Sequence, residues 1–391
     1  MKVKKILFVA ASTFLLAACF ESGMSAGSLP KGGTPATAQS TVLAIGNAYD
    51  SLMDLDSFEA NFDLKKAHVD LKLGQTFEAP ASKQGGILGN RMVEEVDGFG
   101  IIQADASMKA KFAVTGLTST SVDDVEAEAS ISDLGIDLYV GTEIGTEVTP
   151  EVDFDFSGVD VAAYISTGNL YVNASDNELR SMISEILVAT GTPEEEVGQT
   201  MENIPEKFYQ PGVINADALP LLDTFFNQVL GIETPPTKED VMTGLGEVLN
   251  ESSFATLADY ITLLDYEDGS FGISVDLSKE DVLSLLTLVL SSNGDQMTEE
   301  QIQTAVTEYG KMFEIGALKA TILLNSDALL TDVLFDIDVS VDTSKSELYT
   351  QSEETPILLD LAYKSALTFK YGDNVSVNLP TDLSSYAVLA N

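Results

Sequence analysis

The alternation of apolar and polar residues predicts that much of this chain forms a sheet. From residue 104 to residue 114 every even position is apolar, and every odd position except Ala113 is polar or charged. Period-two alternation over this length places one face of a strand in a core and the other in water. The same pattern recurs at 125–131, 134–140, 152–156, 159–165, 170–172, 318–324 and 333–341. We expect further strands at 57–73, 271–275, 357–371 and 375–379, a hairpin turn at 167–169, and a glycine-containing loop at 83–100. Strands that follow one another without intervening helices favour an antiparallel meander.

Between residues 175 and 313 the apolar residues change to a spacing of three or four, which is typical of amphipathic helices. Helix start signals recur there: a capping box at 175–178, a proline at 193, and capping hydroxyls at Thr237, Ser278 and Thr298. We expect helices at 40–53, 216–230, 238–250, 254–264, 278–290 and 298–313, and others starting near 175 and 192. Such helices must bury their apolar stripes, and the sheet is the available partner. The predicted fold class is α+β, with a helical insertion at about 175–313 packed on the inner face of an antiparallel sheet.

The first nineteen residues predict export. Three lysines precede the apolar stretch 6–18, and the segment ends in Leu16-Ala17-Ala18-Cys19, so residues 1–18 have the form of a secretory signal peptide. The cleavage site resembles the lipobox of bacterial lipoproteins, which implies cleavage before Cys19 and acylation of that cysteine, palmitate being one such acyl group. A plain signal peptide or an uncleaved anchor is the alternative, although an apolar stretch of 13 residues is short of the roughly 20 that span a bilayer.

These signals divide the chain into three parts. After the signal peptide, residues 19–39 are rich in Gly, Ser, Ala, Pro and Thr, which predicts a lipidated flexible tether. Residues 40–391 are expected to form one α+β domain. The expected location is the extracytoplasmic face of a cell membrane, either periplasmic or at the cell surface, with the lipid on Cys19 as the contact to the membrane.

The charge of the chain excludes one class of partner. Sixty-two Asp and Glu residues stand against 20 Lys and Arg, for a formal net charge of −42. Nucleic acids and anionic lipid headgroups need neutralising cations, so we expect no nucleic-acid binding. The excess acid itself is explained by solubility or by adaptation to a salty environment.

The residue inventory offers little for catalysis. His68 is the only histidine and Cys19 the only cysteine, so neither a Ser-His-Asp triad nor a zinc site can be assembled convincingly. Paired acids such as Asp153 and Asp155 stand two apart in alternating strands, which places them on a solvated face. The acidic run 265–269 departs from the spacing of an EF-hand. We therefore expect no enzymatic activity, no cofactor and no metal.

Three stretches carry a resemblance to a known family. They are the helix-to-strand entry at 52–62, the hairpin at 161–172, and the closing stretch 375–380. In this pattern the chain resembles the lipoprotein-carrier family and its LppX/LprG-type lipoprotein relatives. The resemblance implies a curved antiparallel half-barrel, with helices closing its concave side over a lipid-binding cavity.

Non-covalent binding of a lipid or another hydrophobic ligand is the function we expect. The candidate ligand-binding residues are Met182, Ile186, Phe225 and Phe226, because they lie on apolar helix faces turned toward the sheet. An ordinary core explains the same residues. Two other functions stay open: a surface structural or interaction lipoprotein without a ligand, and the substrate-binding lipoprotein of an importer. Nothing in the sequence indicates which protein partners the chain would have.

Overall fold

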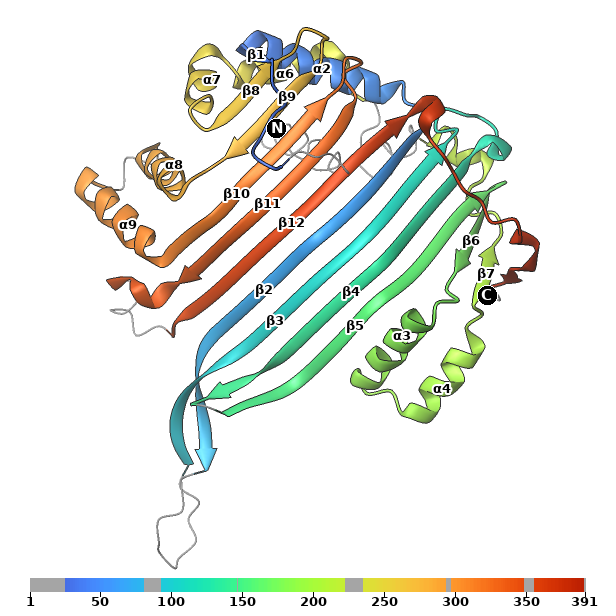
Figure 1. Ribbon diagram of the computed structural model, residues 1–391, viewed down its shortest axis with the longest axis horizontal. Helices are drawn as coiled ribbons and strands as arrows, with labels where there is room; N and C mark the ends of the chain where they lie inside the picture. Colours follow the sequence, from blue (N-terminus) through green and yellow to red (C-terminus); the bar gives the residue numbers. More distant parts are fainter. Residues whose placement is uncertain are drawn as a thin grey trace, which may run out of the picture.

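The structure is a computed structural model that describes residues 25–80, 93–145, 147–221, 235–292, 297–347 and 355–389. Its fold class is α+β: one open sheet of 13 strands with helices at its sides (Figure 1). The strand order is β1-β8-β9-β10-β11-β12-β2-β3-β4-β5-β6-β7-β13. All neighbouring pairs are antiparallel except β13 and β7, which run parallel.

Four long strands form the middle of the sheet as an antiparallel meander, as the alternation predicts. They are β2 (Phe58–Pro80), β3 (Val93–Thr115), β4 (Glu126–Ile144) and β5 (Glu147–Ser166). The pattern at 125–140 predicted two strands, but β4 is continuous, because a bulge at Asp133 (φ 54°) absorbs the break in alternation. The start of β3 also corrects the expected loop at 83–100, since residues 93–100 pair with β2.

The C-terminal strands return to pair with the N-terminal ones. Strand β12 (Ile357–Tyr371) lies beside β2, so segments about 300 residues apart in sequence become neighbours, with Tyr371 opposite Phe58. The remaining strands are β1 (Thr34–Pro35), β6 (Asn169–Asn173), β7 (Lys207–Gln210), β8 (Ile261–Asp265), β9 (Phe271–Asp276), β10 (Phe313–Leu324), β11 (Leu330–Asp342) and β13 (Ala387–Val388).

The helices at Thr237, Ser278 and Thr298 begin where these capping residues predict. The helix expected from a capping box at 175–178 is capped by Asp176 instead, and Pro193 precedes its helix rather than starting it. Thr37, Thr237 and Thr298 each form a capping box, and the Asp176 side chain accepts a hydrogen bond from the Leu179 backbone N–H. Within the described residues the helices are α2 (Ala38–Met53), α3 (Asn177–Ala189), α4 (Glu194–Asn203), α6 (Lys238–Val248), α7 (Glu251–Leu257), α8 (Lys279–Ser292) and α9 (Glu299–Met312). Single-turn 3₁₀ helices lie at Val122–Asp124, Ala216–Ala218, Thr343–Lys345, Gly372–Asn374 and Leu383–Ser385.

Helices α2 and α3 cover two separate parts of one sheet face. Ala44 and Ala48 of α2 pack on a cluster that includes Val333 and Leu367, each 2% exposed. At the other side of the sheet, Leu179 of α3 packs with other apolar side chains from β4 and β5: Leu134, Phe154, Phe156, Val159 and Val161. The expected packing of helices on an apolar sheet face is thus present at two places along that face.

Three expectations for the helical insertion and its flanks are wrong. Strands β7 and β8 interrupt the insertion in addition to the expected strand β9, and residues 254–264 form one short helix followed by β8. Strand β8 forms because its backbone groups pair with β9 in a hairpin, which overrides the helical spacing of its apolar residues. Residues 375–379 were expected to form the last strand, but the backbone there binds side chains of the sheet instead.

The expected flexible tether at 19–39 is also wrong from residue 25 onward. The Gly27 N–H donates to Thr321 Oγ1 at 3.0 Å, and Tyr266 OH donates to the Pro30 carbonyl at 3.0 Å. Thr34 and Pro35 form β1 on the edge strand β8. Glycine favours this path, because a Cβ at Gly27 would lie 2.9 Å from Lys319 Cδ and its φ is +80°. The chain therefore lies on the sheet well before the first helix.

Candidate functional site

The candidate site is a rectangular patch on the central strands, which we call the open apolar face. Strand register places its nine apolar residues in three rows across β2, β3 and β4. The rows are Ala67-Ala106-Ile136, Val69-Ala104-Leu138 and Leu71-Ile102-Val140. All nine side chains point to the same side of the sheet, because side chains alternate along each strand and the register pairs them directly.

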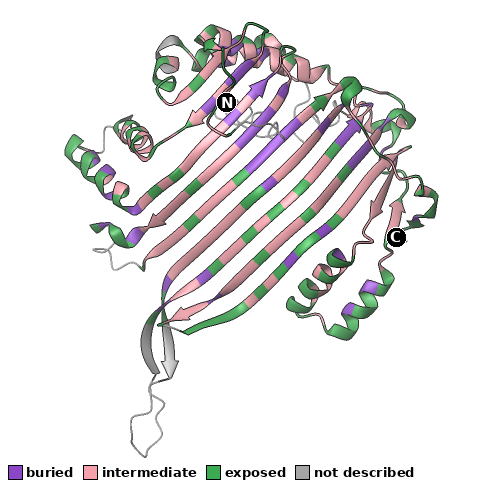
Figure 2. Ribbon diagram, viewed as in Figure 1, coloured by how far each residue is buried: buried purple, intermediate pink, exposed green. Residues whose placement is uncertain are grey.

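This patch is less covered than the parts of the apolar face beneath α2 and α3. Ile102 is 38% exposed, and the other eight residues are half-buried. None of the nine is fully buried. On the same face Phe112 of β3 is 41% exposed, whereas Val159 beneath α3 is fully buried. Figure 2 shows the central strands with intermediate and exposed residues along most of their length. Large apolar side chains in water are unfavourable, so a surface of this kind is typical of a binding site.

The patch continues onto strands β12 and β11. Alternate residues Leu359, Leu361 and Tyr363 are half-buried and share the face of Ile357, which pairs with Leu73. Val339 and Ile337 pair with Leu361 and Tyr363 and extend the patch by one more strand. Five strands at about 4.8 Å and five residues at about 3.3 Å span roughly 20 by 13 Å. Small side chains at Ala104 in the middle row and at Ala67 and Ala106 in the adjacent end row leave this part of the surface lower than its larger neighbours.

The opposite face of the same strands is polar. It carries His68, Asp105 and Asp137 in one row and Asp70, Gln103 and Tyr139 in the next. His68 Nδ1 lies 2.9 Å from Asp105 Oδ1, whose side chain is 52% exposed. Among the residues that the structure describes, no group of three or more His, Cys, Asp or Glu could hold a metal ion. Among the described residues of this face, His68 and Asp105 thus form an exposed hydrogen-bonded pair, and no nucleophile lies beside a base.

One end of the polar face buries two carboxylates under residues 375–380, which we call the C-terminal strap. Glu59 is 3% exposed, and it accepts hydrogen bonds from Lys370 Nζ at 2.6 Å and from the Ser376 N–H at 3.2 Å. Glu128, 8% exposed, accepts from Lys111 Nζ at 2.6 Å and from the Asn378 N–H at 2.9 Å. Hydrogen bonds to charged groups are among the stronger ones in proteins, so these pairs hold the strap on the sheet.

The pKa of Glu59 reflects this environment. Burial alone raises the pKa of the carboxyl, but hydrogen bonds from Lys370, Asn61 and Ser376 stabilise the carboxylate more, and the pKa falls below its ordinary value. The carboxylate is thus charged at neutral pH and serves the strap. The groups that donate hydrogen bonds to Glu59 all belong to the fold itself, so the arrangement is structural.

The residues that sequence reasoning selected do not form one site. Met182 lies on α3 beside the core cluster of Phe156 and Val159, while Ile186, one turn further along, is 42% exposed. Phe225, Phe226 and Cys19 lie outside the described residues. The open apolar face was missed because its residues belong to strands whose alternation was assigned to a core. The run of alanines at even positions of β3 was the available signal, since alanine fills a core poorly.

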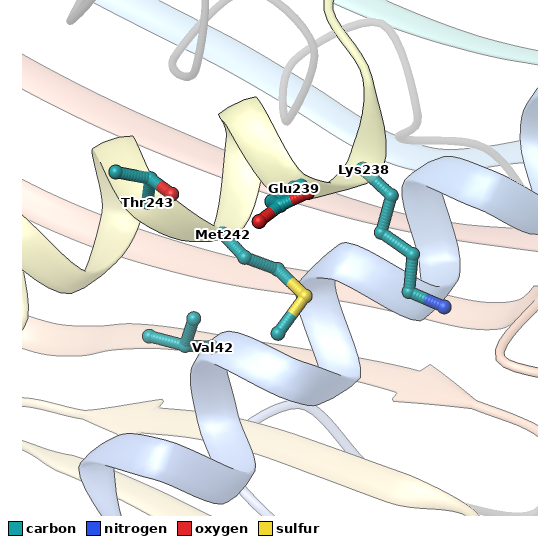
Figure 3. A pocket seen from close by; sticks show the side chains of 5 residues that line it. All are labelled: Val42, Lys238, Glu239, Met242 and Thr243. Atoms are coloured by element: carbon teal, nitrogen blue, oxygen red, sulfur yellow. The ribbon is translucent and has the colours of Figure 1, made fainter.

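Two open pockets lie elsewhere on the molecule. The first, of about 450 Å³, is lined by Val42 of α2 and by Lys238, Glu239, Met242 and Thr243 of α6. In Figure 3 the Met242 side chain extends from α6 toward α2, where Gly46 leaves room for it. The second, of about 540 Å³, has a mostly polar lining that includes Asn325, Asp327 and Lys370. Neither pocket includes a residue of the open apolar face.

Comparison with known proteins adds no assignment. No protein-family model matches the chain, and no curated protein is similar to it. Across the described part of the chain, none of the helices has both the length and the apolar character needed to cross a membrane. The site is therefore argued from its geometry alone.

Proposed function

We propose that this protein is a lipoprotein, anchored to the extracytoplasmic face of a membrane through Cys19, that binds a lipid or another hydrophobic ligand without catalysis. The open apolar face is the observation that carries the proposal, because its aliphatic side chains are only half-buried on the central strands. The signal peptide and lipobox pattern at 1–19 support the location.

The energetics favour an apolar ligand of modest size. Covering about 200 Å² of apolar surface stabilises a complex by about 5 kcal/mol before the costs of association. An elongated acyl chain suits a surface that is lower at its alanines, with larger side chains such as Leu71 and Leu138 beside them. The bordering side chains include no ionic group on the same face of β2, β3 or β4, so recognition would depend on shape and burial.

We further propose that the sheet is a curved half-barrel whose concave side carries the open apolar face. Helices α2 and α3 support this arrangement, because both pack on the same sheet face at separate places. A concave sheet with helices at two sides would enclose a ligand on three sides. This matches the architecture that the resemblance to the lipoprotein carriers implies.

A paired substitution tests the ligand site. Ala106→Asp places a charge within the open apolar face, and Ser107→Asp places the same charge on the opposite, exposed side of the same strand. Native mass spectrometry and lipid extraction of the purified protein should find a co-purifying apolar ligand in the parent and in Ser107→Asp, and at least tenfold less in Ala106→Asp. Circular dichroism of all three confirms that the fold is intact.

Two outcomes would contradict the ligand proposal. One is a parent protein that carries no apolar ligand and takes up none from vesicles. The other is equal ligand content in the two variants. The first outcome would make the surface lipoprotein without a ligand the better explanation, and the second would place the ligand away from the open apolar face.

The anchor has its own test. Cys19→Ser removes the acyl acceptor and should move the protein from the membrane fraction to the soluble fraction. Metabolic labelling with a fatty acid should mark the parent and leave the variant unmarked. Retention of Cys19→Ser in the membrane would point to an uncleaved signal sequence as the anchor.

A further inference from the structure

Helix α8 (Lys279–Ser292) exposes large apolar side chains on its outer side. Leu288 is 49% exposed and Val289 is 55% exposed, and the half-buried Leu285 lies one turn before them. Leu283 faces the other way, since a Cβ at Gly310 of α9 would lie 3.1 Å from Leu283 Cδ1. At 100° a residue, Leu285, Leu288 and Val289 centre on the side of α8 opposite Leu283. The apolar surface therefore points away from the protein.

The first described residues lie near the start of this helix. Gly27 lies against Lys319 and Asp276, the last residue of β9, and α8 begins three residues after Asp276. The Leu277 N–H donates to the Leu318 carbonyl at 3.0 Å and holds this junction on β10. Residues 25–30 and α8 thus lie near the same edge of the sheet, while α3 lies near the opposite edge (Figure 1).

A short stretch of chain connects this place to the lipid. Six peptide steps separate Cys19 from Ser25, and at no more than about 3.6 Å a residue they reach about 20 Å. A membrane that holds the acyl chains of Cys19 must therefore lie close to the β9–α8 side of the sheet. Helix α3 is seven strands away from β9 in the order, or roughly 35 Å at about 4.8 Å a strand.

We infer that the outer side of α8, with Leu285, Leu288 and Val289, rests in the lipid surface that anchors Cys19. This inference depends on the lipid anchor of the proposed function. Burial of these three aliphatic side chains contributes only a modest free energy of binding. Such a contact is too weak to recruit the free protein, but the anchor raises the local concentration so that it orients the domain.

The charge distribution predicts the kind of lipid surface. The chain carries a net charge of −42, and α8 has acids in its first turn and no basic residue in its last turn. The contact is therefore apolar, and an anionic surface would oppose it. We expect the closest contact on zwitterionic phosphatidylcholine and weaker contact when anionic lipid is added at low salt.

The absence of tryptophan from the sequence allows a direct test with a single reporter. The full-length lipidated protein carrying Leu288→Trp is placed in phosphatidylcholine vesicles that contain brominated lipid as a quencher. Val188→Trp on α3, at a position 42% exposed, is the matched control. We expect the Leu288→Trp emission to shift to shorter wavelength and to be quenched at least threefold more than that of Val188→Trp.

The outcomes separate this inference from the anchor on which it depends. Equal quenching of the two reporters in protein that floats with the vesicles would overturn the inference and leave the anchor standing. Protein that fails to float, with acyl-free Cys19 by mass spectrometry, would overturn both. If Leu288→Trp disturbs α8, Val289→Trp supplies a second reporter, and quenching equal to that of Val188→Trp there has the same meaning.

Discussion

Two regions of one sheet reverse the usual distribution of charged and apolar residues. Under the C-terminal strap, the charged side chains of Glu59 and Glu128 are 3% and 8% exposed. On the other face of the same strands, Ile102 is 38% exposed and its apolar neighbours are half-buried. The carboxylates tolerate burial because lysines and backbone N–H groups pair with them. The apolar residues have no equivalent compensation, which is the physical reason to look for a ligand there.

Different kinds of segment cover the two faces of this wide, open sheet. Segments from the two ends of the chain lie on the polar face, near Thr321 and near Glu59, and bind it through hydrogen bonds. Helices α2 and α3 lie on the apolar face and pack by apolar contact. The covering segments thus match the chemistry of the face on which they lie. The open apolar face differs from both covered regions, because neither kind of segment lies on it.

The largest predicted effect compares two leucines on one strand. Leu367 is 2% exposed in the core beneath α2, whereas Leu361 is half-buried on the same face of β12. Leu367→Ala should lower the free energy of unfolding by about 3 kcal/mol, because it leaves a cavity, and Leu361→Ala by about 1 kcal/mol. Urea denaturation followed by circular dichroism measures both. Equal losses would mean that the open apolar face is packed as tightly as the core.

The second prediction tests the buried carboxylates. Glu59→Gln removes the charge that faces Lys370 and the strap, and it should cost about 2 kcal/mol. Asp63→Asn is the control on the same face of β2, where the pair with Lys65 is long (3.7 Å) and exposed, and it should cost less than about 0.5 kcal/mol. A small effect of Glu59→Gln would show that the strap is held by other contacts.

The pH dependence of stability sharpens the same point. The folded-state pKa of Glu59 lies below its ordinary value of 4.5, so the carboxylate stabilises the fold above that value and loses its contribution as pH falls through the lowered pKa. The stability difference between the parent and Glu59→Gln should therefore be full at about pH 6 and shrink toward about pH 3. Urea denaturation at stepped pH measures it. A difference that does not change with pH would contradict the role of the charge.

The smallest predicted effect concerns the N-terminal segment on the polar face. Tyr266→Phe removes the hydroxyl that donates to the Pro30 carbonyl at 3.0 Å, and an exposed hydrogen bond of this kind contributes about 1 kcal/mol or less. Global stability should hardly change, but tryptic cleavage after the exposed Lys31 should become a few times faster. Tyr363→Phe, on β12, serves as the control and should leave the cleavage rate as it is.

Much of the fold follows from local patterns. The alternation at 104–114 predicts a strand with two unlike faces, and the capping residues Thr237 and Thr298 predict where α6 and α9 begin. These signals are local, because side-chain alternation and caps involve residues that are close in sequence. The patterns at 261–265 and 375–379 misled for the opposite reason. Their conformations depend on pairing outside the segment, with β9 and the distant β1 for one and with Glu59 and Glu128 for the other.

The candidate site was the least predictable part. Sequence reasoning selected Met182 and Ile186 on an amphipathic helix, and the structure places Met182 beside a core cluster and leaves Ile186 exposed. The residues of the open apolar face showed the same alternation as any buried strand. An open strand face differs from a buried one only in whether other segments cover it, and the pattern of a single strand does not predict that coverage.

The sequence by itself determined which residues of a strand share a face and where the helices at Thr237 and Thr298 begin, and its net charge of −42 predicts no nucleic-acid binding. Only the tertiary structure decided which part of the apolar face stays open. That outcome depends on the pairing of β2 with β12 and on how far α2 and α3 reach across the sheet. Burial is a property of the whole arrangement, because a leucine beneath a helix belongs to the core and a leucine beside the helix belongs to the open apolar face.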